Sequence, residues 1–305
     1  MNGNTYKIAM VGLDLTAMDD TIIRYLPTLL KALPLERVIF VHIAKELELP
    51  DEIIKKYPDV IAPLDENIAD GINSTIKDIF ENTGVDYDII VREGTPLENF
   101  LKLAKIKNVD LIVMGRKKEL EGSGLLAGHI VRKSPTSLLL ITENNTPSID
   151  TVLVPVDFSR HSSMALSLGQ EVCKRTGADL KFSHVYKVPI GYHKTGKSFE
   201  EFAQIMKTHA ESDFVRFCES NGVKDHPTCD FLLSDDKPVP KLIYESARKS
   251  NSDLIIIGSR GRTRTSALLI GSIVEKLVLK DSDIPVLVVK NKGESMSFFE
   301  AIMNI

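Results

Sequence analysis

The sequence predicts an α/β protein of two tandem domains, each built on a five-stranded parallel sheet of the Rossmann-like kind. Two observations lead to this fold class. The chain repeats itself at a constant offset, and within each repeat short apolar runs alternate with longer amphipathic runs. Strands that are apolar on both faces and separated by helices are typical of a parallel sheet covered by helices on both sides.

The repeat is defined by pairs of landmark residues that keep one register. Three such pairs are each 143 positions apart: Asp14 and Asp157, Gly115 and Gly258, and Gly128 and Gly271. A chance similarity would not preserve one offset across three separated landmarks. We therefore expect a domain at 1–145 and a second domain at 148–305, joined by the polar, turn-forming stretch 144–147.

The order of elements is clearest in the second copy. An apolar strand at 151–157 is followed by a helix that begins at Ser159 and ends at Gly177, a residue suited to a helix C-terminus. The remaining elements are expected as strand 179–188, helix 198–220, strand 228–234, helix 240–251, strand 252–258, helix 270–280 and strand 284–289. In open sheets of this kind, ligands bind beyond the carboxyl ends of the strands, where Asp157 and Gly258 lie.

Composition excludes several classes of protein. The 305 residues are 43% hydrophobic and 26% charged, with a formal net charge of -4, so we expect no nucleic-acid partner. No apolar run approaches the ~20 residues that span a bilayer, and the N-terminus lacks the features of a signal peptide. The three cysteines are scattered and predict neither disulfides nor a zinc site. A cytoplasmic protein without a membrane partner is expected.

The stretch "IIIGSRGRTRTSALLIGSIVEKL" (255–277) carries the strongest functional signal. Its spacing is Gly258-x-x-Gly261-x9-Gly271-Ser272, between a buried strand and an amphipathic helix. Glycine permits a close approach of ligand to backbone, and a helix N-terminus with a serine hydroxyl and nearby arginines favours an anion such as phosphate. The pattern differs from the Walker A motif, which the chain lacks.

This loop, with "SDLIIIG" before it and the first strand ending in "VPVDFS", resembles the universal stress protein family. The resemblance covers the whole chain as a tandem pair and implies an adenine nucleotide alpha hydrolase-like fold. It also implies that the second domain binds ATP, or ADP or AMP, with or without Mg²⁺. The nucleotide-binding residues that it implies are Pro155, Val156, Asp157, Ser159, Val185, Gly258, Arg260, Gly261, Gly271, Ser272 and Ile273.

The first copy departs from the family's pattern. At the same register, Lys118 stands in place of Gly261, His129 in place of Ser272 and Gly12 in place of Pro155. A lysine at the position of a close-approach glycine is expected to fill the site. We therefore expect the N-terminal domain to bind nucleotide weakly or not at all.

The functional expectation is a stress-response or regulatory protein that binds an adenine nucleotide in its C-terminal domain, with little or no catalysis. No metal-ligand cluster or nucleophile arrangement is visible, and whether the protein is an enzyme stays open. The alternative is a nucleotide-independent interaction module that binds a protein partner or an apolar ligand. The resemblance also implies that 137–142 and 284–289 join the two domains as an intrachain pseudo-dimer; a homodimer remains open. The segment 294–305 is expected to form a short amphipathic helix.

Overall fold

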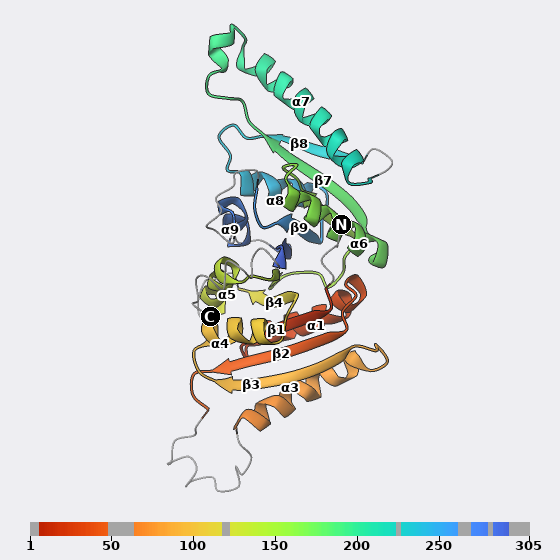
Figure 1. Cartoon of the computed structure of the whole chain (residues 1–305), viewed down its shortest axis with the longest axis vertical. Helices are drawn as coiled ribbons and strands as arrows, with labels where there is room; N and C mark the ends of the chain where they lie inside the picture. The colour runs from red at the N-terminus through yellow and green to blue at the C-terminus, as the bar shows by residue number, and fades with distance from the viewer. Residues whose placement is uncertain are drawn as a thin grey trace.

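The computed structural model describes residues 6–47, 64–117, 123–223, 227–261, 270–279 and 283–292, without the side chains of 123–125. Ten strands form one continuous sheet in the order β3-β2-β1-β4-β5-β10-β9-β6-β7-β8 (Figure 1). The N-terminal half supplies one side of this sheet and the C-terminal half the other. The residues expected to carry the tail helix, 294–305, lie outside the described part.

The two halves repeat the same succession of elements. The N-terminal half contains β1 (Ile8–Leu13), α1 (Ala17–Ala32), β2 (Arg37–Ala44), α3 (Leu64–Phe80), β3 (Asp86–Glu93), α4 (Pro96–Ile106), β4 (Leu111–Arg116), α5 (Ser123–Lys133) and β5 (Ser137–Thr142). The C-terminal half contains β6 (Thr151–Pro155), α6 (Arg160–Thr176), β7 (Asp179–Tyr186), the 3-10 turn η1 (Tyr192–Thr195), α7 (Phe199–Ser220), β8 (Cys229–Leu233), α8 (Val239–Lys249), β9 (Leu254–Gly258), α9 (Ser272–Val278) and β10 (Val286–Val289). All strand pairs within each half are parallel.

Local sequence signals set the ends of the helices. Ser159 caps α6 by accepting a hydrogen bond from the Ser162 N–H, and Gly177 ends it with a positive φ of 85° that a side chain would disfavour. Ser198 and Glu201 form a reciprocal capping box at the start of α7. The two strand-start aspartates are matched as well: Asp110 and Asp253 each accept two backbone N–H groups of the neighbouring first strand. The contacts of Asp110 and Asp253 therefore fix equivalent pairs of strands in the same way in the two halves.

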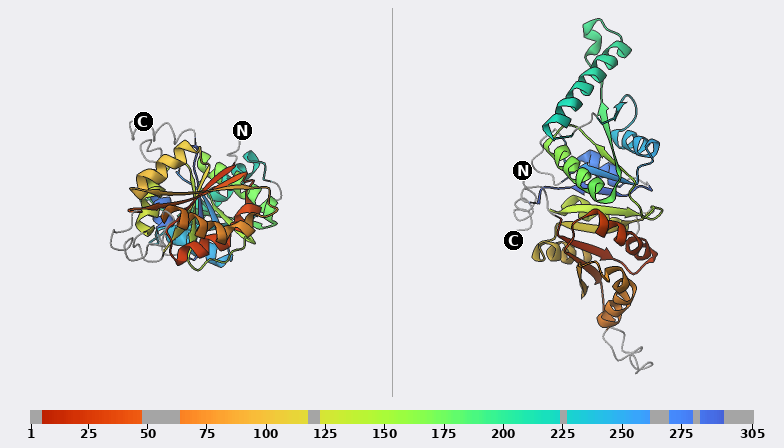
Figure 2. Two further views of the ribbon diagram at one scale, coloured as in Figure 1. Left: turned by 90° about the horizontal axis from the view of Figure 1, so that it is seen from below. Right: turned by 90° about the vertical axis from the view of Figure 1, so that its right-hand side faces the viewer.

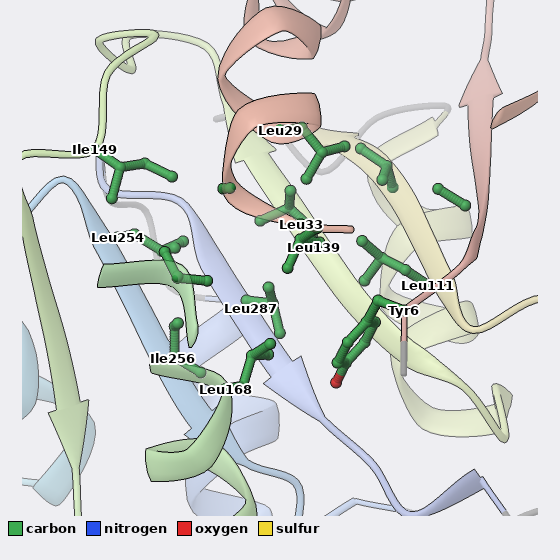
Figure 3. Close-up of a cluster of buried hydrophobic side chains, with 14 of the residues drawn as sticks. Tyr6, Leu29, Leu33, Leu111, Leu139, Ile149, Leu168, Leu254, Ile256 and Leu287 are labelled. Carbon is green, nitrogen blue, oxygen red and sulfur yellow. The ribbon is translucent and has the colours of Figure 1, made fainter. Parts of the chain in front are cut away.

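The halves are joined by their last strands. β5 and β10 pair antiparallel, with Leu287 opposite Leu139, and both side chains are buried. Around them, residues from both halves form one apolar cluster that includes Tyr6, Leu33 and Leu254 (Figure 3). Pairing removes the exposed edge of two strands that are buried along their whole length. The predicted fold class, including the intrachain pseudo-dimer, is confirmed.

Helices cover both faces of the sheet (Figure 2). One buried cluster includes residues of α1, α3, α6 and α7, and the second includes residues of α4, α5, α8 and α9. Each cluster contains residues from both halves, so the core is continuous across the β5–β10 junction. Each of the two clusters is therefore shared by both halves of the chain.

Two buried cations, Lys290 and Arg116, form polar links between the halves. Lys290, which follows β10, is fully buried and donates from Nζ to the carbonyl oxygens of Val131 (3.0 Å) and Ser134 (2.7 Å) at the end of α5. Arg116, at the end of β4, donates to the carbonyl oxygen of Val278 at the end of α9 (3.1 Å). Each link satisfies carbonyl groups that a helix C-terminus leaves without an intrahelical partner.

Candidate functional site

Two cavities occupy equivalent places at the carboxyl ends of the strands. The cavity of the C-terminal half has a volume of about 290 Å³, and that of the N-terminal half about 410 Å³. Both lie near the size range of small-molecule sites, roughly 300–1,000 Å³. The nucleotide-binding residues predicted from the sequence belong to the half that contains the C-terminal cavity.

Ten of the eleven predicted residues line the C-terminal cavity. They are Pro155, Val156, Asp157, Val185, Gly258, Arg260, Gly261, Gly271, Ser272 and Ile273. They come from the ends of β6, β7 and β9 and from the start of α9. Ser159 is not among the lining residues, because its hydroxyl accepts the Ser162 N–H at the cap of α6. Ligand contacts for all eleven stay a prediction.

Asp157 is held in one orientation. Its Oδ1 accepts hydrogen bonds from the Ser162 hydroxyl (2.6 Å) and the Ser159 N–H (3.1 Å). The Ser162 oxygen in turn accepts the Asp157 backbone N–H (3.0 Å). Neutral hydroxyl and amide groups therefore fix the orientation of this carboxylate. The carboxylate is therefore pre-positioned at the cavity wall.

Two glycines of the motif are required for close packing. A Cβ at Gly261 would lie 2.8 Å from Asp157 Oδ2, so any side chain there would displace the carboxylate. A Cβ at Gly258 would lie 2.5 Å from the backbone oxygen of His161, so this glycine is needed for the approach of α6 to β9. Packing alone therefore explains why residue 258 is a glycine, independently of any ligand. The glycine at 261 instead leaves the space next to Asp157 at the cavity wall open.

Arg260 brings a cation into the cavity wall. Its Nε is buried, and within the described part of the chain it has no hydrogen-bond acceptor. A buried donor left without an acceptor is costly, and such groups are rare in folded proteins. The residues 262–269, which include the two further arginines of the loop, lie outside the described part. Arg260 is therefore the described group best suited to an anionic oxygen.

The start of α9 differs from the expectation in one respect. The sequence predicted an anion-binding helix N-terminus at Gly271-Ser272, which requires backbone N–H groups that are free to donate, but the Gly271 N–H donates to the carbonyl oxygen of Ser259 at 2.8 Å. This bond closes the loop onto the end of β9. The part of the expectation that concerns Gly271 is wrong, and α9 is only seven residues long.

Several lining residues were missed by sequence reasoning. They are Ser162, Lys187, Val239, Ile243, Ile257 and Val274. Val239 and Ile243 are four apart on α8, a spacing that places both on one helix face. Lys187 directly follows β7, as Arg260 lies just beyond β9. A search of every strand end and of the starts of α6, α8 and α9 could have found them.

The N-terminal cavity is formed by the equivalent strand ends, but different side chains line it. Lys117 Nζ forms an ion pair with Asp14 Oδ2 at 2.9 Å, so the aspartate equivalent to Asp157 is bound by a lysine. The Phe100 ring packs over Gly12, where a Cβ would lie only 3.0 Å from it. Lys118, the residue predicted to fill this site, lies outside the described part of the chain.

Two other kinds of feature are absent from the described residues. None of the described helices is long and apolar enough to cross a membrane. Among the same residues, no group of three or more histidine, cysteine, aspartate or glutamate side chains could hold a metal ion. The described site consists of a cavity, one oriented carboxylate and nearby cations.

Comparisons with known proteins agree with this architecture. The model of the universal stress protein family matches residues 5–142 and again 148–290. A universal stress protein of Methanocaldococcus jannaschii is 30% identical over 156 residues, 47% of this chain and 95% of the relative. A universal stress protein of Mycobacterium tuberculosis is 23% identical over 235 residues, which cover 72% of this chain and 75% of the relative.

The solved structures show the same fold over nearly the full length. The crystal structure of a universal stress protein from Archaeoglobus fulgidus superposes with a TM-score of 0.62, covering 95% of this chain and 98% of that one at 19% identity. The two consecutive family matches coincide with the two structural repeats that meet at β5 and β10. The chain belongs to the universal stress protein family, as a tandem protein with two family domains.

Proposed function

We propose that the C-terminal half binds an adenine nucleotide, with ATP as the first candidate, and that the protein is a nucleotide-responsive regulator in stress physiology. The observation that carries the proposal is the buried Nε of Arg260, which has no acceptor within the described residues and lies at the cavity wall. A phosphate oxygen would satisfy this donor through a charge-assisted hydrogen bond.

The remaining wall suits the other parts of a nucleotide. The side chains of Val185, Val239 and Ile243 supply apolar surface to the cavity lining, against which a flat base would be desolvated. The fixed carboxylate of Asp157 is an acceptor for a ribose hydroxyl or a base N–H. Lys187 is a second cation among the lining residues, in addition to Arg260. Mg²⁺, where it participates, would arrive on the phosphates, since Asp157 is the single carboxylate among the described lining residues.

The proposal is tested by ligand-dependent stability. ATP at 100 times its Kd would stabilise the folded state by about 2.7 kcal/mol. For a domain of this size, that is a rise in melting temperature of roughly 5 °C or more. Gly261→Ala places a methyl group in the space next to Asp157 Oδ2 and should abolish the rise.

Gly191→Ala is the matched control, because a Cβ at Gly191 would meet no atom within 4 Å. It should leave the ATP-dependent rise unchanged. Absence of any rise at millimolar ATP with Mg²⁺ would overturn the proposal and leave the interaction-module interpretation. A rise that survives in Gly261→Ala would place the nucleotide elsewhere. The proposal assigns the cytoplasm as compartment, where the three free thiols remain reduced.

A further inference from the structure

The N-terminal cavity is a built site with its own chemistry. It is the larger of the two equivalent cavities, about 410 Å³ against about 290 Å³. Most of its wall is apolar, with Phe100, Met114 and Leu97 among the lining side chains. The Gly12 and Phe100 pair takes the place that Pro155 and Ile243 occupy in the other half, so the cavity is reshaped rather than filled.

The residues that line the two cavities differ in formal charge, although Lys117, which is outside the N-terminal lining, forms an ion pair with Asp14. The residues lining the C-terminal cavity include one carboxylate, Asp157, and two cations, Lys187 and Arg260. The residues lining the N-terminal cavity include two carboxylates, Asp14 and Asp19, and one cation, Lys45. Formal charges are therefore +1 in the first case and -1 in the second. A polyphosphate is favoured by the first lining and disfavoured by the second.

Asp19 is the residue that makes this difference. It occupies the position of Ser162, 143 residues earlier in the chain, and its two oxygens accept the backbone N–H groups of Asp14 (3.1 Å) and Leu15 (2.8 Å). Both contacts come from neutral amides, and within the described residues Asp19 has no ion-pair partner. Asp14, by contrast, is engaged by Lys117 at 2.9 Å and by the Thr16 hydroxyl at 2.6 Å.

We propose that the N-terminal cavity binds a small amine with an apolar body, whose ammonium pairs with Asp19 and whose body lies against Phe100, Met114 and Leu97. The ammonium supplies the cation that Asp19 lacks, and burial of the body removes apolar surface from water. This site goes beyond the nucleotide site proposed above and does not depend on it. The same geometry disfavours anions of similar shape.

Indole ligands give a direct test, because the chain contains no tryptophan and the ligand's own fluorescence can be followed. Tryptamine is the probe, and indole-3-propionate is the matched anion with the same ring. Fluorescence anisotropy should show saturable binding of tryptamine and at least tenfold weaker binding of indole-3-propionate. Equal affinities, or no saturable binding of tryptamine, would overturn the proposal.

Variants then locate the site. Asp19→Ser copies the residue of the other half and should weaken tryptamine binding at least tenfold, and Asp19→Asn, which keeps one acceptor oxygen and the side-chain size, should do the same. Gly261→Lys alters only the C-terminal cavity and should leave tryptamine affinity unchanged. Far-UV circular dichroism verifies that each variant is folded. Wild-type affinity in either folded Asp19 variant, or a loss in Gly261→Lys, would refute the assignment.

Discussion

Lys290 offers a quantitative test of the junction between the two halves. The side chain is fully buried, and its ammonium donates to two carbonyl oxygens at the end of α5. Burial, together with the smaller effect of the positive charge of Arg260, lowers the pKa of Lys290 from 10.5 to about 7. Lys290→Met removes the titrating group while keeping an unbranched apolar side chain.

The sign of the effect follows from where the proton is bound. Between pH 7 and 10.5 the unfolded chain retains a proton that the folded chain has largely released. The free energy of unfolding therefore rises with pH across this window, by about 1.4 kcal/mol per unit where the difference is complete. Because Lys290 is half titrated at pH 7 in the folded state, its contribution from pH 7 to pH 9 is about 2 kcal/mol.

Urea unfolding of the wild type and of Lys290→Met at pH 7 and at pH 9 measures this contribution. Other groups titrate in the same range, including the three buried or half-buried thiols, but they are common to both proteins and cancel in the difference. The gap between the two proteins should change by about 2 kcal/mol in favour of the wild type on going from pH 7 to pH 9. A gap that stays constant would show that the ammonium is not desolvated in the folded state, and the account of the junction would be wrong.

Three further changes probe the nucleotide cavity and the packing. Ser162→Asp installs the N-terminal residue beside Asp157 and should weaken ATP binding at least tenfold by calorimetry; unchanged affinity would show that lining charge does not separate the cavities. Leu287→Ala removes a side chain that is 1% exposed at the β5–β10 junction and should cost about 2–5 kcal/mol in urea unfolding. Ile190→Ala, at 93% exposed, is its control and should change stability by less than about 0.5 kcal/mol. Arg116→Met leaves the Val278 carbonyl without this donor and should cost about 1–3 kcal/mol, measured in the same way.

The repeat and the alternation of elements were sufficient to predict the fold. A constant offset of 143 residues predicts that equivalent strands take equivalent places in the sheet. The observed order of strands around β1 is the same as the order around β6. The apolar runs at 137–142 and 284–289 also indicated which strands would meet. These signals are either local in the sequence or repeated within it. The fold could therefore be predicted from one sequence.

The differences between the cavities could not be read from the sequence in the same way. Gly12 stood out as a departure from the family's pattern, but its reason lies in Phe100, which is 88 positions later and packs its ring over the glycine. The ion pair between Lys117 and Asp14 likewise depends on the position of the β4 end relative to the β1 end. Lys118 was expected to fill the site, whereas the contact within the described residues is made by its neighbour Lys117.

The matched positions explain how one frame can serve two chemistries. Asp14 and Asp157 hold the same place at the end of the first strand, so the aspartate alone cannot distinguish the cavities. At one neighbouring position the C-terminal half has a hydroxyl that donates to this aspartate, and the N-terminal half has a second carboxylate. At a second matched position, the N-terminal half has Lys117, which neutralises Asp14. The C-terminal half has Arg260, whose buried Nε has no acceptor within the described residues. If these two positions determine the class of ligand, exchanging their residues between the halves should exchange the preference for an anion and for an amine. The apolar residues buried across β5 and β10 are not altered by this exchange, so the backbone around both cavities should stay the same.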